Sequence, residues 1–104
     1  MIKYTNKYTD KSFDIDKCRE SAESGYAPAQ YQLGHCYAAG RGVTEDYSQT
    51  VRWYSRAVDF GGNAFPEAQR GLADCYANGD GVRKNAKQAA LWYAKAEEQN
   101  IRPN

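Results

Sequence analysis

The stretch AQYQLGHCYAAGRGVTEDYSQTVRWYSRA, residues 29–57, recurs 39 residues later as AQRGLADCYANGDGVRKNAKQAALWYAKA, residues 68–96. The copies align without a gap, and both tryptophans of the chain, Trp53 and Trp92, fall at one repeat position. In first-copy numbers, the identical positions are Ala29, Gln30, Leu33, Cys36, Tyr37, Ala38, Gly40, Gly42, Val43, Gln49, Trp53, Tyr54 and Ala57. Such self-similarity is typical of proteins built from stacked repeats.

Each copy reads as a helix, a glycine-rich turn and a second helix. The apolar residues that mark one face of the first helix are Ala29, Leu33, Cys36 and Tyr37, at positions i, i+4, i+7 and i+8. Gly40 then follows, a residue type that takes the left-handed conformation in which many helices end. Asp46 and Asn85 share one repeat position and are good N-caps for the second helix. The pattern predicts an all-α fold.

A chain of 104 residues predicts a single domain. An offset of 36 aligns Asp10 with Asp46 and Ile15 with Val51, which indicates a lone second-type helix before the two full units. We therefore expect an N-terminal tail at 1–9, a leading helix at 10–25, repeat 1 at 27–61 and repeat 2 at 65–100. The expected total is five helices.

The run AxxxLGxxYxxGxGVxxDxxxxxxWYxxA resembles the Sel1-like repeat, a relative of the tetratricopeptide repeat. The matching residues are Leu33, Gly34, Tyr37, Gly40, Gly42, Trp53 and Tyr54, and in the second copy Leu72, Tyr76, Gly79, Gly81, Trp92 and Tyr93. The second copy departs at Ala73, which replaces Gly34, and at Asn85, which replaces Asp46. The resemblance implies a short right-handed α-solenoid of about two and a half repeats, whose first-type helices line a concave face. It also implies a protein-protein interaction module.

Composition narrows the function classes. The formal net charge is +1, which gives no electrostatic reason to expect nucleic acid or an anionic membrane. No apolar run is long enough for a signal peptide or a membrane span. The three cysteines, an odd number, favour reduced thiols in a cytoplasmic protein.

The repeated residues are expected to be architectural, because large aromatic residues at helical spacing usually lie in the core. Function is then expected on the exposed side of the first helix of each unit, where the copies differ. The candidate partner-binding residues are Tyr31, Gln32, His35, Arg70, Asp74 and Asn78. They include a tyrosine and an arginine, which are favoured at binding hot spots. The alternative is an ordinary solvated face.

Catalysis and metal binding have little support in the sequence. His35 is the only histidine, no nucleophile motif such as GxSxG is present, and we expect His35 to lie near Asp74 as a surface ion pair at most. Cys36 and Cys75 lack the spacing of a zinc site and are expected to be buried thiols. A cysteine-rich branch of the family, to which β-lactam hydrolysis has been attributed, has two cysteines per unit, whereas this chain has one. No enzyme activity, metal or cofactor is expected.

The leading hypothesis is a bacterial adaptor that binds a protein partner through the concave face. The alternative is an immunity or inhibitor protein that neutralises a toxin or effector by tight one-to-one binding. A homodimer is a further possibility, because the last helix has no following unit to cover its apolar surface.

Overall fold

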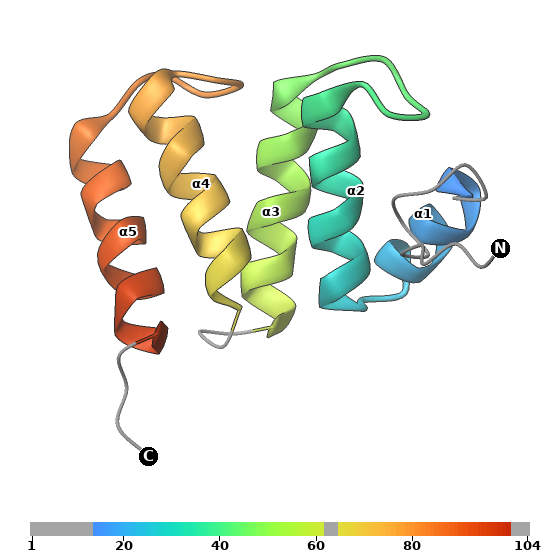
Figure 1. Cartoon of the computed structure of the whole chain (residues 1–104), viewed down its shortest axis with the longest axis horizontal. Coiled ribbons are helices and arrows are strands. Elements are labelled where there is room, and N and C mark those ends of the chain that lie inside the picture. Colours follow the sequence, from blue (N-terminus) through green and yellow to red (C-terminus); the bar gives the residue numbers. More distant parts are fainter. Residues whose placement is uncertain (1–13, 62–64, 101–104) are drawn as a thin grey trace, which may run out of the picture.

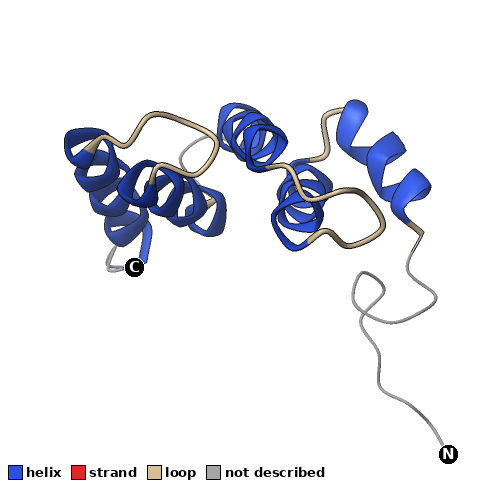
Figure 2. Ribbon diagram, turned by 90° about the horizontal axis from the view of Figure 1, so that it is seen from above, coloured by secondary structure: helices blue, strands red, loops and turns tan. Residues whose placement is uncertain are grey.

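The computed structural model describes residues 14–61 and 65–100, and these residues form five α-helices and no strand. The helices are α1 (Ile15–Glu23), α2 (Ala27–Ala39), α3 (Tyr47–Gly61), α4 (Pro66–Asn78) and α5 (Ala86–Asn100). They follow one another in chain order along the molecule (Figure 1), and the main contacts join consecutive helices. From above, the described helices form an open row (Figure 2). The all-α repeat fold expected from the sequence is confirmed.

The ends of α2 and α4 have the features expected from the repeat. Pro28 and Pro66 lie in the first turn of their helices, where no intrahelical partner is lost by the missing amide hydrogen. Gly40 and Gly79 close the same helices in the left-handed conformation, with φ of 67° and 77°. A side chain is disfavoured at such φ values, which explains why the repeat keeps glycine there.

The helices α3 and α5 begin at the predicted caps. The Asp46 carboxylate accepts hydrogen bonds from the backbone N–H groups of Ser48 at 3.1 Å and Gln49 at 3.4 Å. Asn85 accepts one from the Gln88 N–H at 3.0 Å. These bonds satisfy amide groups that have no partner within the helix.

The leading helix is shorter than the range 10–25 expected for it. Its N-cap is Asp14, whose carboxylate accepts hydrogen bonds from the Asp16 N–H at 3.0 Å and the Lys17 N–H at 3.3 Å. The alignment with the later units pointed to Asp10, but Asp14 supplies the same cap one turn further on. Residues 10–13 and the expected tail at 1–9 lie outside the described residues.

Two buried clusters join the helices. The first, between α1, α2 and α3, consists of Cys18, Ala22, Ala29, Leu33 and Trp53. The second, between α3 and α4, consists of Tyr54, Ala57, Val58, Ala68 and Leu72. Each cluster contains residues from neighbouring units, so the apolar surface of one unit is buried only when the next unit stacks on it.

Tyr54 lies at the closest approach between these units. A Cβ atom added to Gly34 of α2 would lie 2.7 Å from Cδ1 of Tyr54, and one added to Gly71 of α4 would lie 2.5 Å from Cε2. Only glycine leaves room for the ring on both sides. Gly71 lies at the repeat position of Gln32, which differs between the copies, but its contact with Tyr54 makes it a packing residue.

A repeated glutamine is completely buried in each unit. The Gln30 side-chain amide donates a hydrogen bond to the Ala22 carbonyl at 3.0 Å, which ties the start of α2 to the end of α1. Gln69 occupies the same position in α4, yet neither polar atom of its side chain has a hydrogen-bond partner among the described residues. The same residue therefore has different energetic roles in the two units.

All three cysteines are free and buried, which confirms the burial expected for Cys36 and Cys75 and adds Cys18. Burial raises the pKa of the Cys18 and Cys75 thiols to about 11. Burial also raises the pKa of Cys36. The thiols therefore stay protonated near neutral pH and act as small apolar side chains.

Candidate partner-binding surface

The six candidate residues lie on α2 and α4, the first helices of the two repeats. The exposed members are His35 on α2 and Arg70, Asp74 and Asn78 on α4. Tyr31 and Gln32 are half-buried. The candidate residues thus divide into an exposed polar group and two residues that also take part in packing.

Tyr31 is the residue that connects the candidate surface to the core. Its ring stacks on Tyr54, with centroids 5.2 Å apart and planes at 19°. Phe65 approaches it edge-on at 5.6 Å, and the His35 ring lies at 6.4 Å on the solvent side of α2. The aromatic group therefore joins α2, α3 and the start of α4, and it fixes the place of His35 beside Tyr31.

The Tyr31 hydroxyl is influenced by a row of charges on α4. Burial raises its pKa, the Glu67 carboxylate and then that of Asp74 raise it further, and the Arg70 guanidinium lowers it. Sequence reasoning did not select Glu67. Its spacing from Arg70 and Asp74, three and seven residues, is the helical signal that would have found it.

Asp74 is paired with a tyrosine of the next helix. Its carboxylate accepts a hydrogen bond from the Tyr93 hydroxyl, and this bond raises the pKa of Tyr93. Among the described residues no ion pair joins Asp74 to His35, a contact that the sequence had allowed at most. The carboxylate faces α5, whereas the imidazole lies against Tyr31.

The remaining signature residues are arranged around the core. The most buried are Leu33, Gly34, Trp53, Tyr54 and Leu72, whereas Tyr37, Tyr76 and Trp92 are half-buried. Gly42 and Gly81 adopt positive φ in the turns. Tyr93 differs from its counterpart Tyr54, because 39% of its surface is exposed against 6% for Tyr54.

The described residues form a polar surface beside an aromatic cluster, without the features of a metal site or a membrane span. Within residues 14–61 and 65–100, no group of three or more His, Cys, Asp or Glu residues could hold a metal ion. In the same part of the chain no helix is both long and apolar enough to cross a membrane. The surface of α2 and α4 presents exposed polar and charged side chains. Tyr31, which stacks on Tyr54, lies among them.

The helix pairs, their glycine turns and their stacked cores define a helical-repeat protein. The model of the Sel1 repeat matches residues 27–59 and 66–101. The chain belongs to the Sel1 repeat family, as its sequence had indicated.

Solved structures support this assignment. A Sel1 repeat protein from Oxalobacter formigenes matches with a TM-score of 0.77 and 38% identity, over 89% of this chain and 73% of that one. A protective antigen of uropathogenic Escherichia coli with an SLR fold matches with a TM-score of 0.78 and 36% identity, over 89% of this chain and 20% of that one.

One curated relative also matches. It is the secretory immunoglobulin A-binding protein EsiB of Escherichia coli O6:H1, strain CFT073, which is 41% identical over 44 residues. The match covers 42% of this chain and 9% of EsiB. This chain is thus similar to a small part of a much longer protein.

Proposed function

We propose that this chain is a protein-interaction module that binds a protein partner on the exposed side of α2 and α4. The proposed contact residues are Tyr31, Gln32, His35, Arg70, Asp74 and Asn78. The observation that carries the proposal is that the exposed positions of α2 and α4 differ between the two copies. Most of the repeated residues pack the units together, so the differing exposed residues are the ones available for recognition. Sel1 repeat proteins are generally protein-interaction modules.

The chemistry of this surface fits a protein partner. His35, Arg70, Asp74 and the neighbouring Glu67 are exposed and supply donors and acceptors of both charges. Tyr31 contributes an aromatic ring whose position is fixed by its stack on Tyr54. A fixed aromatic residue surrounded by polar groups is the usual composition of an interface hot spot and its rim.

The same features favour binding over catalysis. His35 is exposed and has an aromatic neighbour, Tyr31, rather than a carboxylate that would orient it as a base.

The buried, reduced thiols fit the cytoplasmic location expected from the sequence.

The proposal is tested by recovering bound protein from cells with the tagged chain and three single variants. Arg70→Ala and His35→Ala remove exposed groups from the proposed surface. Arg52→Ala is the matched control, because Arg52 is an equally exposed helical arginine on α3. We expect the first two variants to lose the partner and the control to keep it. Retention by all three variants would show that the wrong surface has been chosen.

A first candidate partner can be tested directly by a binding assay. The name of EsiB describes binding of secretory immunoglobulin A, so purified immunoglobulin A is the first probe. An adaptor and a dedicated inhibitor of a toxin or effector differ in how they bind. The inhibitor predicts one partner held one-to-one with slow dissociation, whereas the adaptor predicts weaker binding or several partners.

A further inference from the structure

The outer side of α5 differs chemically from the matching side of α3. In α3, the side that α4 helps to cover carries Val51, Tyr54 and Val58. At the same repeat positions α5 carries Ala90, Tyr93 and Glu97, which we call the stacking facet of α5. All three residues of the stacking facet are exposed. Two valines of the stacked helix are thus replaced by a methyl group and a carboxylate.

Tyr93 cannot take the place that Tyr54 takes. The Tyr54 ring lies against Gly34, where an added Cβ would come within 2.7 Å of it. The second repeat has Ala73 at this position and therefore possesses that Cβ. The Tyr93 hydroxyl bonds instead to Asp74, and 39% of its surface is exposed. The alanine Cβ therefore excludes from the second repeat the close ring contact that Tyr54 makes with Gly34.

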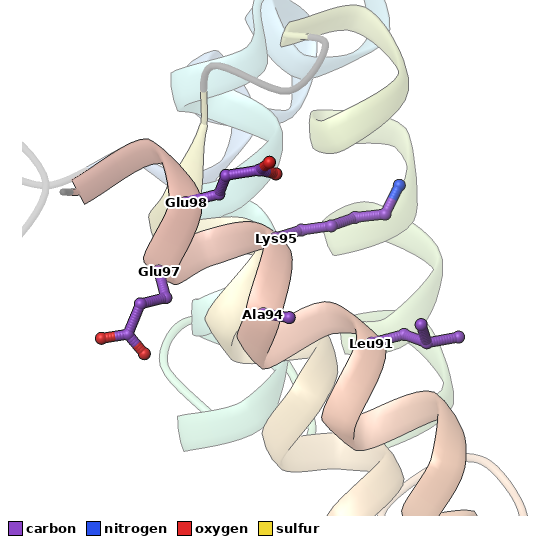
Figure 3. Close-up of a pocket in the computed structure, with 5 residues that line it drawn as sticks. All are labelled: Leu91, Ala94, Lys95, Glu97 and Glu98. Atoms are coloured by element: carbon purple, nitrogen blue, oxygen red, sulfur yellow. The ribbon is translucent and has the colours of Figure 1, made fainter. Parts of the chain in front are cut away.

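Glu97 is the second obstacle to stacking. Its counterpart Val58 is 7% exposed and belongs to the cluster shared by α3 and α4. A helix placed on α5 in the same manner would have to bury the Glu97 carboxylate, which is strongly unfavourable without a partner. Glu97 and Lys95 extend in different directions from α5 (Figure 3).

The neighbouring side of α5 is also charged. The lining of a shallow depression of about 470 Å³ consists of Leu91, Ala94, Lys95, Glu97 and Glu98 (Figure 3). Leu91, 56% exposed, is the one large apolar side chain in this lining, and the other side chains are that of Ala94 and three charged ones. A single exposed leucine among charges is ordinary protein surface rather than an apolar patch.

We infer that Glu97, together with Ala90, prevents the stacking facet of α5 from pairing with another repeat helix or with α5 of a second copy. The facet keeps the shape of a repeat helix but lacks the apolar surface that holds α4 on α3. The end-to-end homodimer considered from the sequence is therefore not favoured at this facet. The inference does not depend on the proposed partner-binding surface, which lies on α2 and α4.

The experiment restores the α3 pattern and measures self-association by sedimentation equilibrium. The test variants are Glu97→Val alone and Ala90→Val with Glu97→Val. The matched control is Ala90→Val with Glu98→Val, which adds the same side chains but places one valine at the position where α3 keeps the exposed Asp59. Circular dichroism checks that each variant keeps its helix content, which is expected because all the changed positions are exposed.

We expect the double test variant to self-associate with a constant at least about tenfold above that of the wild-type chain, because it regains the apolar stacking surface. The single variant should give a smaller increase. The control should associate no more than the wild-type chain does. Equal association constants for the wild-type chain and the test variants would overturn the inference, and so would an equal increase in the control.

Discussion

Gly71 of α4 faces the ring of Tyr54 so closely that a Cβ atom at Gly71 would lie 2.5 Å from Cε2 of the tyrosine. Gly34 of α2 stands in the same relation to the other edge of the ring, at 2.7 Å from Cδ1. Tyr54 thus fills the space between two helices of adjacent units, and each helix contributes a glycine to make that space. This contact sets the distance between the repeats on which the candidate surface depends.

Gly71→Ala should destabilise the chain by about 1–3 kcal/mol, because the added methyl group forces the Tyr54 ring or α4 to move. In an open position within a helix, the same substitution stabilises by about 1 kcal/mol through helix propensity. The sign of the change in the free energy of unfolding, measured with urea, therefore shows whether Gly71 is in close contact with Tyr54 or lies at an open position. A stabilised variant would contradict the close contact.

Gln30→Leu and Gln69→Leu form a matched pair at one repeat position. The first should destabilise by about 0.5–1.5 kcal/mol, because it removes the Gln30 hydrogen bond and leaves the Ala22 carbonyl with the Gly25 N–H as its donor. The second should be neutral or stabilising, because it removes two buried polar atoms that have no partner. Urea unfolding of both variants measures the difference. Equal destabilisation by the two changes would show that Gln69 has a partner after all.

The effects of Tyr31→Ala and His35→Ala on stability should distinguish a packing residue from a surface residue. The first should cost on the order of 2 kcal/mol of stability, since it removes the ring that stacks on Tyr54 and meets Phe65. The second should change stability by less than about 0.5 kcal/mol, because His35 is exposed. Thermal unfolding measures both. If His35→Ala proved as destabilising as Tyr31→Ala, His35 would be a packing residue and an unsuitable probe of binding.

The thiols should be unreactive in the folded chain. A pKa of about 11 keeps Cys18 and Cys75 protonated at pH 8, and burial shields all three sulfur atoms from a reagent. A disulfide reagent such as Ellman's reagent should therefore label no thiol of the native protein and all three after denaturation. Rapid labelling of one thiol in the native state would contradict the buried position of that cysteine.

The fold could be predicted in some detail because its signals are local and repeated. The helix caps at Asp46 and Asn85 and the left-handed glycines at positions 40 and 79 each depend on a few neighbouring residues. The periodicity of the apolar residues then gave the helices between them. The start of α1 was placed at Asp10 by the alignment of the repeats, whereas the N-cap of this helix is Asp14, four residues later.

The candidate surface was harder to predict because exposure depends on how the helices pack. Tyr31 and Gly71 lie at variable positions of the repeat, yet Tyr31 stacks on Tyr54 and Gly71 makes room for it. Tyr93 lies at an invariant position, yet 39% of its surface is exposed, because no described helix covers it as α4 covers Tyr54. A pattern of identity between copies therefore does not by itself separate core from surface.

The central claim is that a protein partner contacts the exposed side of α2 and α4. The most direct test is the dissociation constant of the purified partner for the double variant His35→Ala, Arg70→Ala, measured beside the control Arg52→Ala by calorimetry. We predict that the double variant weakens binding at least about tenfold and that the control binds as the wild-type chain does. Unchanged affinity of the double variant, with weaker binding by the control, would contradict the claim.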